Sequence, residues 1–186
     1  MDFPEIIFGN SDFLEWAQVK IRHAMTLDTR LAKQIHLMSE SLKETYTALE
    51  PYFRQYIETV CKECKDPCCV NRHGFPDFED LIVFCALDEN FGPFDYTQKD
   101  TEPCQFLGEK GCTLQRCERS YRCTWYFCDK VFDRFEAEDQ KAFVRFEQLM
   151  DQLCQQRIGI IKLFKKLWYL ELRISPDPMK NKGGIQ

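Results

Sequence analysis

The sequence lacks a long apolar run and a recognisable leader. Its most apolar stretch, IGIIKLFKKLWYL at residues 158–170, contains three lysines and is shorter than the roughly 20 apolar residues of a membrane-spanning helix. The first residues, MDFPEIIFGNSDF, have neither the basic start nor the apolar segment of a secretory signal peptide. We therefore expect a cytoplasmic protein with no membrane partner.

An excess of positive charge is also missing. The chain has 25 Lys and Arg against 30 Asp and Glu, a formal net charge of -5, so broad contact with a phosphate backbone is unfavourable and no nucleic-acid partner is expected. The sequence contains no glycine-rich phosphate loop, dinucleotide fingerprint, nucleophile elbow or H-E-x-x-H zinc motif. No residue is therefore assigned a catalytic role, and whether the protein is an enzyme stays open.

The apolar content is sufficient for a core, and the spacing of the apolar residues indicates helices. Apolar residues make up 44% of the chain and include sixteen Phe. They recur at steps of three and four, as on one face of an α-helix, on both sides of the cysteine-rich middle. We predict a mainly α protein whose helical arms pack around an irregular, cysteine-rich, metal-binding core. Its single domain spans residues 1–174, with N-terminal helices at 11–60, the core at 61–128, C-terminal helices at 129–174, and a flexible polar tail at 175–186.

Local signals divide these segments further. Asp77, with Asp80 in the first turn, predicts the start of a helix. Pro51 is expected to end one helix or begin the next, because it lacks the backbone N–H. Gly159 is expected to bend or divide the last helical segment. The sequence GEKGC at residues 108–112 indicates a small hairpin.

Eleven cysteines are the most informative feature. A reducing cytoplasm disfavours disulfides, and an odd number of cysteines cannot pair completely. Cys85 and Cys154 stand apart inside apolar helical patterns, which predicts core packing. The others form two groups: Cys61, Cys64, Cys68 and Cys69, then Cys104, Cys112, Cys117, Cys123 and Cys128.

These groups favour metal binding over redox chemistry. Cys61 and Cys64 form a C-x-x-C, but they close a predicted helix rather than follow a strand, as a thioredoxin-like dithiol would. Adjacent Cys68 and Cys69 cannot easily point the same way, so either each faces a different centre or only one is a ligand. Two four-thiolate sites and one site that draws on both groups remain open, and so do zinc and an iron–sulfur cluster.

The motifs CKECKDPCC, PCQFLGEKGC and CERSYRCTWYFC together resemble the YkgJ-type cysteine-cluster family, a zinc- or iron-chelating domain. The resemblance covers residues 61–128. Ser120 stands where that family usually has Pro, Thr124 where it usually has Arg, and Cys117 is an addition, which leaves open whether Cys117 or Cys123 is the ligand. The resemblance implies eight metal ligands: Cys61, Cys64, Cys68, Cys69, Cys104, Cys112, Cys123 and Cys128, with Cys117 as a possible extra one.

Arginines flank the second group. Arg116, Arg119 and Arg122 are expected to donate hydrogen bonds to sulfur and offset the negative charge of a thiolate site. We favour this interpretation over a solvated basic loop and over a site for an anionic substrate. His73 is a weaker ligand candidate, because a loop histidine that only hydrogen-bonds is the commoner case.

The sequence therefore predicts a metal-binding protein with cysteine-coordinated zinc or iron–sulfur centres. Their role is expected to be mainly structural, or that of an interaction module with a protein partner. The alternatives are an iron–sulfur enzyme and a metal carrier. Redox chemistry or methyl transfer is implied for the enzyme only by the resemblance, since some relatives of that family look like lysine methylases or carry iron–sulfur centres.

Overall fold

The computed structural model describes residues 3–6, 10–65, 68–71, 74–88, 94–95, 97–99, 101–109, 111–138 and 140–174. Helices dominate these residues, and their only sheet is a two-stranded one, so the prediction of a mainly α protein is confirmed. The predicted tail at 175–186 and the candidate ligand His73 lie outside the described residues.

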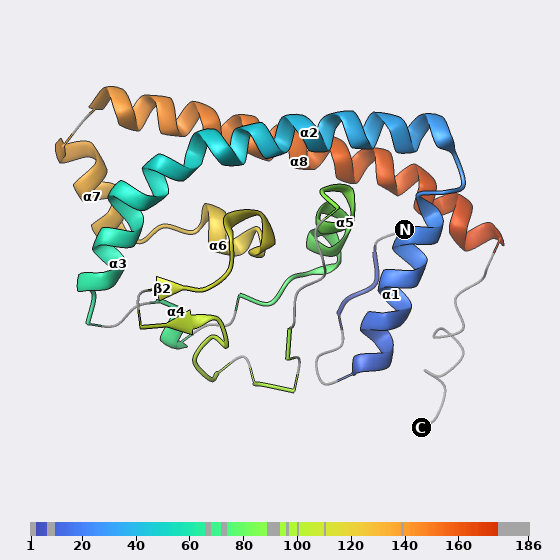
Figure 1. Ribbon diagram of the computed structural model, residues 1–186, viewed down its shortest axis with the longest axis horizontal. Coiled ribbons are helices and arrows are strands. Elements are labelled where there is room, and N and C mark those ends of the chain that lie inside the picture. Colours follow the sequence, from blue (N-terminus) through green and yellow to red (C-terminus); the bar gives the residue numbers. More distant parts are fainter. Residues whose placement is uncertain are drawn as a thin grey trace.

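Two long helices form one side of the molecule. Helix α2 (Thr29–Tyr52) and helix α8 (Gln140–Ile174) run side by side in opposite directions (Figure 1). Their facing stripes are buried, as the spacing of apolar residues predicts; among these residues are Leu31, Ile35, Leu42, Leu49, Leu153, Ile160 and Phe164. Among the described residues, no helix combines the length and the apolar character needed to cross a membrane.

Gly159 does not divide α8, contrary to expectation, because the helix continues through it without interruption. A β-carbon at this position would overlap the end of the Met38 side chain on α2. The glycine therefore allows the close approach of the two long helices.

Pro51 does not end a helix either. It lies inside α2, and the chain continues through a π-helical turn (Phe53–Glu58) into helix α3 (Thr59–Glu63). A widened turn just beyond a proline is one way for a helix to absorb a break in its hydrogen-bond ladder. The helical path therefore reaches Cys61 without a loop.

Two shorter helices pack below the long pair. Helix α1 (Ser11–Ala24) and helix α5 (Phe78–Ala86) both contact α8. The start of α5 is the predicted one: Asp77 Oδ1 accepts from the Asp80 backbone N–H at 2.8 Å, and Asp80 Oδ2 accepts from the Asp77 N–H at 3.1 Å. This reciprocal cap fixes where the chain turns from the cysteine-rich segment into the core.

In the described part of the cysteine-rich segment, the elements are short. They are α4 (Cys68–Asn71), β1 (Leu107–Gly108), β2 (Gly111–Cys112), the 3₁₀ turn Arg116–Glu118 and α6 (Arg122–Trp125), followed by α7 (Asp129–Glu138). Leu107 pairs with Cys112 and Gly108 with Gly111, so the predicted hairpin is confirmed. Gly111 has a φ of +107°, a conformation that favours glycine. These elements lie beneath the long helices (Figure 1).

Candidate metal centre

All eleven cysteines are among the described residues, and none of them forms a disulfide. The eight candidate ligands sit in, or within three residues of, the short elements: Cys61 and Cys64 at α3, Cys68 and Cys69 in α4, Cys104 and Cys112 at the hairpin, Cys123 in α6 and Cys128 before α7. Short elements leave most of the surrounding backbone free of regular hydrogen bonding. The thiols therefore come from segments that regular secondary structure alone does not hold together.

Cys69, Cys104, Cys112 and Cys123 form one set of neighbours, which we call the Cys69 set. The Cys104 N–H donates to the Cys69 carbonyl at 2.7 Å, and the Leu107 N–H donates to the Cys104 carbonyl at 2.9 Å. Because Leu107 pairs with Cys112, the hairpin brings Cys112 toward Cys104. The pKa of Cys69 is raised to about 12, mainly by burial and then by negative charge at the three other thiols.

Cys61, Cys64, Cys68 and Cys128 form a second set, the Cys61 set. The Cys64 N–H donates to the Cys61 carbonyl at 3.3 Å, which turns the chain at the end of α3. Local desolvation raises the pKa of Cys61, and negative charge at three other thiols adds to the rise: those of Cys128, Cys68 and Cys64. Arg134 on α7 and Glu63 on α3 form an ion pair, 3.8 Å apart. This ion pair joins the helix that contains Cys61 to the helix that directly follows Cys128.

The adjacent residues Cys68 and Cys69 therefore act with different sets. The sets adjoin, because negative charge at Cys61 also raises the pKa of Cys69, although less than the thiols of the Cys69 set do. In the part of the chain that the structure describes, no three Cys, His, Asp or Glu side chains form a group with the geometry to hold a metal ion. The thiols of each set are electrostatic neighbours rather than a closed coordination shell.

The remaining cysteines contact the helical core or residues that pack on it. Cys117 is partly buried against the helical core, and negative charge on it acts on the buried Tyr46 of α2. Cys85 also packs against the core, and Cys154 forms a hydrogen bond with Tyr121. The structure thus places Cys123 with the Cys69 set and Cys117 toward the helices.

Arg116 is buried between the cysteine-rich segment and α2. Arg116 is 7% exposed, and its guanidinium carbon lies 3.7 Å from the centre of the Phe53 ring. The pKa of Arg116 is lowered to about 10, mainly by burial and then by the positive charge of Arg119, while negative charges, including that of Cys112, limit the fall. A buried cation therefore lies within electrostatic range of the Cys69 set, as expected for charge compensation.

Arg119 also acts on this set, whereas Arg122 is exposed on α6. The Arg119 side chain donates twice to the Leu114 carbonyl, at 3.0 and 2.8 Å. Desolvation raises the pKa of Cys123, while a hydrogen bond from Ser120 and the positive charge of Arg119 counteract that rise. The Ser120 Oγ–Cys123 Sγ distance is 3.4 Å.

Asp80 is not near a thiol set but anchors the segment that carries Cys123. Its Oδ1 accepts from the Tyr121 backbone N–H at 3.0 Å and lies 3.0 Å from the Arg157 guanidinium on α8. Asp80 and Arg157 are 3% and 5% exposed, so this ion pair is buried. Sequence reasoning missed Arg157, because one arginine in an apolar helical stripe gives no signal of its partner.

No family model matches the chain, and no curated protein or solved structure matches it at a significant level. The resemblance to the cysteine-cluster family therefore stays a prediction that rests on the cysteine motifs alone.

Proposed function

We propose that the protein binds metal through two sets of four cysteine thiolates, and that the bound metal mainly serves to organise the segment between the helical arms. The first centre would use Cys61, Cys64, Cys68 and Cys128. The second would use Cys69, Cys104, Cys112 and Cys123. Four thiolates suit a closed zinc site and also suit an iron–sulfur cluster.

The separation of Cys68 and Cys69 supports this proposal most directly. Two neighbouring residues on a short helix cannot easily serve one centre. Charge at Cys68 acts on Cys61, whereas Cys69 is acted on most by Cys123, Cys104 and Cys112. Thiolates that lie close together repel one another. The same negative charge attracts a metal cation, which offsets the repulsion and deprotonates its cysteine ligands. Arg116 and Arg119 beside the Cys69 set would offset the excess negative charge of a four-thiolate site.

A structural role follows from where the thiols come from. Each set combines residues that are far apart in the sequence and belong to short elements. Metal binding would cross-link them with a free energy on the order of 10 kcal/mol, which is typical of structural zinc sites. Eleven cysteines outside disulfides also fit a reducing, cytoplasmic location.

An interaction role is compatible with the surface between the two centres. Trp125 and Tyr126 stand between Cys123 and Cys128 and are 50% and 42% exposed. Large aromatic side chains are enriched where proteins bind other proteins. We include a protein partner in the proposal on this ground.

Anaerobic purification of the tag-free protein, with elemental analysis and an absorption spectrum, tests the proposal. We expect about two centres per chain. Stoichiometric zinc in a colourless protein would identify zinc sites, and iron with sulfide and absorption near about 400 nm would identify clusters. The Cys85→Ser variant serves as control and should keep its metal. A protein that contains no metal and takes up neither zinc nor iron under reducing conditions would contradict the proposal.

A further inference from the structure

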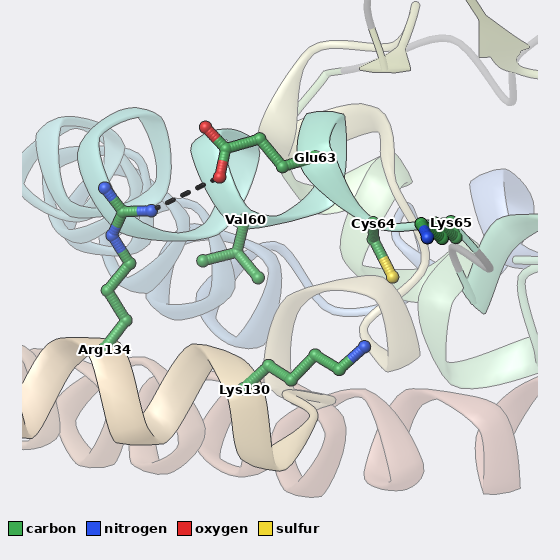
Figure 2. A pocket seen from close by; sticks show the side chains of 6 residues that line it. All are labelled: Val60, Glu63, Cys64, Lys65, Lys130 and Arg134. Carbon is green, nitrogen blue, oxygen red and sulfur yellow. Dashed lines mark ion pairs between the residues drawn. The ribbon is translucent and has the colours of Figure 1, made fainter.

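A cleft of about 430 Å³ opens between the end of α3 and the first turns of α7. It is lined by Val60, Glu63, Cys64, Lys65, Lys130 and Arg134 (Figure 2). This volume lies in the range of small-molecule sites. The cleft thus has room for a ligand rather than only for water.

The charges that line the cleft are unusual for this protein. Lys65, Lys130 and Arg134 are cations and Glu63 is the one carboxylate, so the lining carries a charge of about +2 when these groups have their ordinary charges. The whole chain has a net charge of -5. An acidic protein that gathers positive charge in one hollow attracts anions to it.

The cations of the cleft fall into two groups: Arg134, which pairs with Glu63, and the two lysines. Glu63 pairs with Arg134 at 3.8 Å on one wall. Figure 2 shows the Lys130 side chain extending along the cleft to the region of Cys64 and Lys65. Within the described residues, neither lysine has an ion-pair partner at 4.0 Å or less. An anion between the two ammonium groups would satisfy both, and Val60 would contact an apolar part of the ligand.

We propose that this cleft binds a small dianion, namely a phosphate group or a dicarboxylate, between Lys65 and Lys130. The lysines supply point charges, and Arg134 supplies a planar guanidinium that can turn from Glu63 toward a phosphate or carboxylate. The site goes beyond the proposed metal function and does not require metal. Because Cys64 lines the cleft, however, the anion would lie beside the centre proposed for the Cys61 set.

Calorimetric titration of the full chain with inorganic phosphate and with succinate tests this site. We expect dissociation constants on the order of 1 mM, weakened by added salt. The double substitution Lys65→Gln with Lys130→Gln should weaken binding at least about tenfold, which is about 1.4 kcal/mol. Lys62→Gln, on α3 and outside the cleft lining, is the matched control and should bind like the unaltered protein.

Metal content measured on the same samples separates this proposal from the first one. Phosphate or succinate binding that depends on the two lysines would support the site whether or not metal is present. Absence of binding by the unaltered protein, or equal binding by the double variant, would overturn it. If the unaltered protein binds no anion and the double variant loses metal, the proposal of an anion site is wrong. The lysines would then serve to offset negative charge at Cys64.

Discussion

Gly74 lies directly against the sulfur of Cys123. A β-carbon on Gly74 would overlap this sulfur and would stand 3.6 Å from Ser120 Oγ, which itself hydrogen-bonds to the same sulfur. Only a hydrogen atom fits at this position, so the glycine forms part of the wall around a thiol of the Cys69 set. In the sequence, Gly74 lies in the segment NRHGFPDF, which indicates only a loop.

Gly74→Ala should therefore disturb one centre and spare the other. The added methyl group must push the Cys123 sulfur aside, whereas the thiols of the Cys61 set do not contact Gly74 among the described neighbours. We expect loss of about half of the bound metal with helix content retained, measured by elemental analysis and circular dichroism.

Gly159→Ala is the matched control. A β-carbon there meets the flexible end of the Met38 side chain, which can move, and alanine favours a helix interior by about 1 kcal/mol. This variant should keep all of its metal. A Gly74→Ala protein with full metal content would show that Cys123 is not a ligand at this wall.

Two adjacent substitutions test the division into sets. Cys68→Ser should remove metal from the Cys61 set, and Cys69→Ser should remove it from the Cys69 set, because each serine removes one of four thiolates. Each variant should retain about half of the metal, and the double variant should retain almost none. If both single variants lost all metal, the eight thiols would serve one shared centre.

The helices were predictable because their signals are local. The apolar stripes and the Asp77 cap depend on residues a few positions apart, and they appear in the structure as expected. The errors at Pro51 and Gly159 have different causes: the chain continues through a π-helical turn beyond the proline, and the glycine lies against Met38 of another helix. Propensity rules describe single helices and cannot anticipate a neighbour.

The candidate site was predictable only as a collection of thiols. The sequence indicates that eight cysteines act together, but the spacing does not state which ones meet. Cys123 and Cys128 are five residues apart, yet one lies with Cys69 and the other with Cys61. The Cys104–Cys69 backbone hydrogen bond, the Arg134–Glu63 ion pair and the Asp80 anchor bring these segments together, and these contacts join residues far apart in the sequence.

Glu171 should stabilise the packing of α1 against α8. Its side chain is 1% exposed and lies 2.7 Å from Lys20 Nζ and 2.5 Å from His23 Nδ1. Glu171→Gln should lower the free energy of unfolding by about 1–3 kcal/mol, because it removes the buried carboxylate charge that pairs with Lys20. Chemical denaturation monitored by circular dichroism measures this loss, and Glu147→Gln, an exposed residue of the same helix, should have almost no effect.

The effect of Glu171 should also depend on pH. Burial alone would raise the pKa of Glu171, but hydrogen bonds and positive charge from Lys20 and His23 lower it below its ordinary value of 4.5. A lowered folded-state pKa stabilises the protein above the unfolded-state value, and this stabilisation is lost as the pH falls through the folded-state value. The difference between unaltered protein and Glu171→Gln should therefore shrink in acid. A difference that grows in acid would mean that burial dominates.

Asp80 should show the opposite pH dependence. Burial raises its pKa from 3.8 to about 6, although Arg157 and two backbone hydrogen bonds favour the charged form. A raised folded-state pKa contributes stability that is fully present below 3.8 and is lost as the pH rises through about 6, by up to about 1.4 kcal/mol per pH unit. We therefore compare the free energy of unfolding of the unaltered protein with that of Asp80→Asn. The unaltered value minus the variant value should fall between pH 3.8 and about pH 6 and level off at higher pH. If metal is bound, both proteins should lose it in acid, so the subtraction largely removes that contribution. A difference that instead rises with pH would show that the Arg157 ion pair outweighs burial, and that the anchor of the Cys123 segment depends on a charged Asp80.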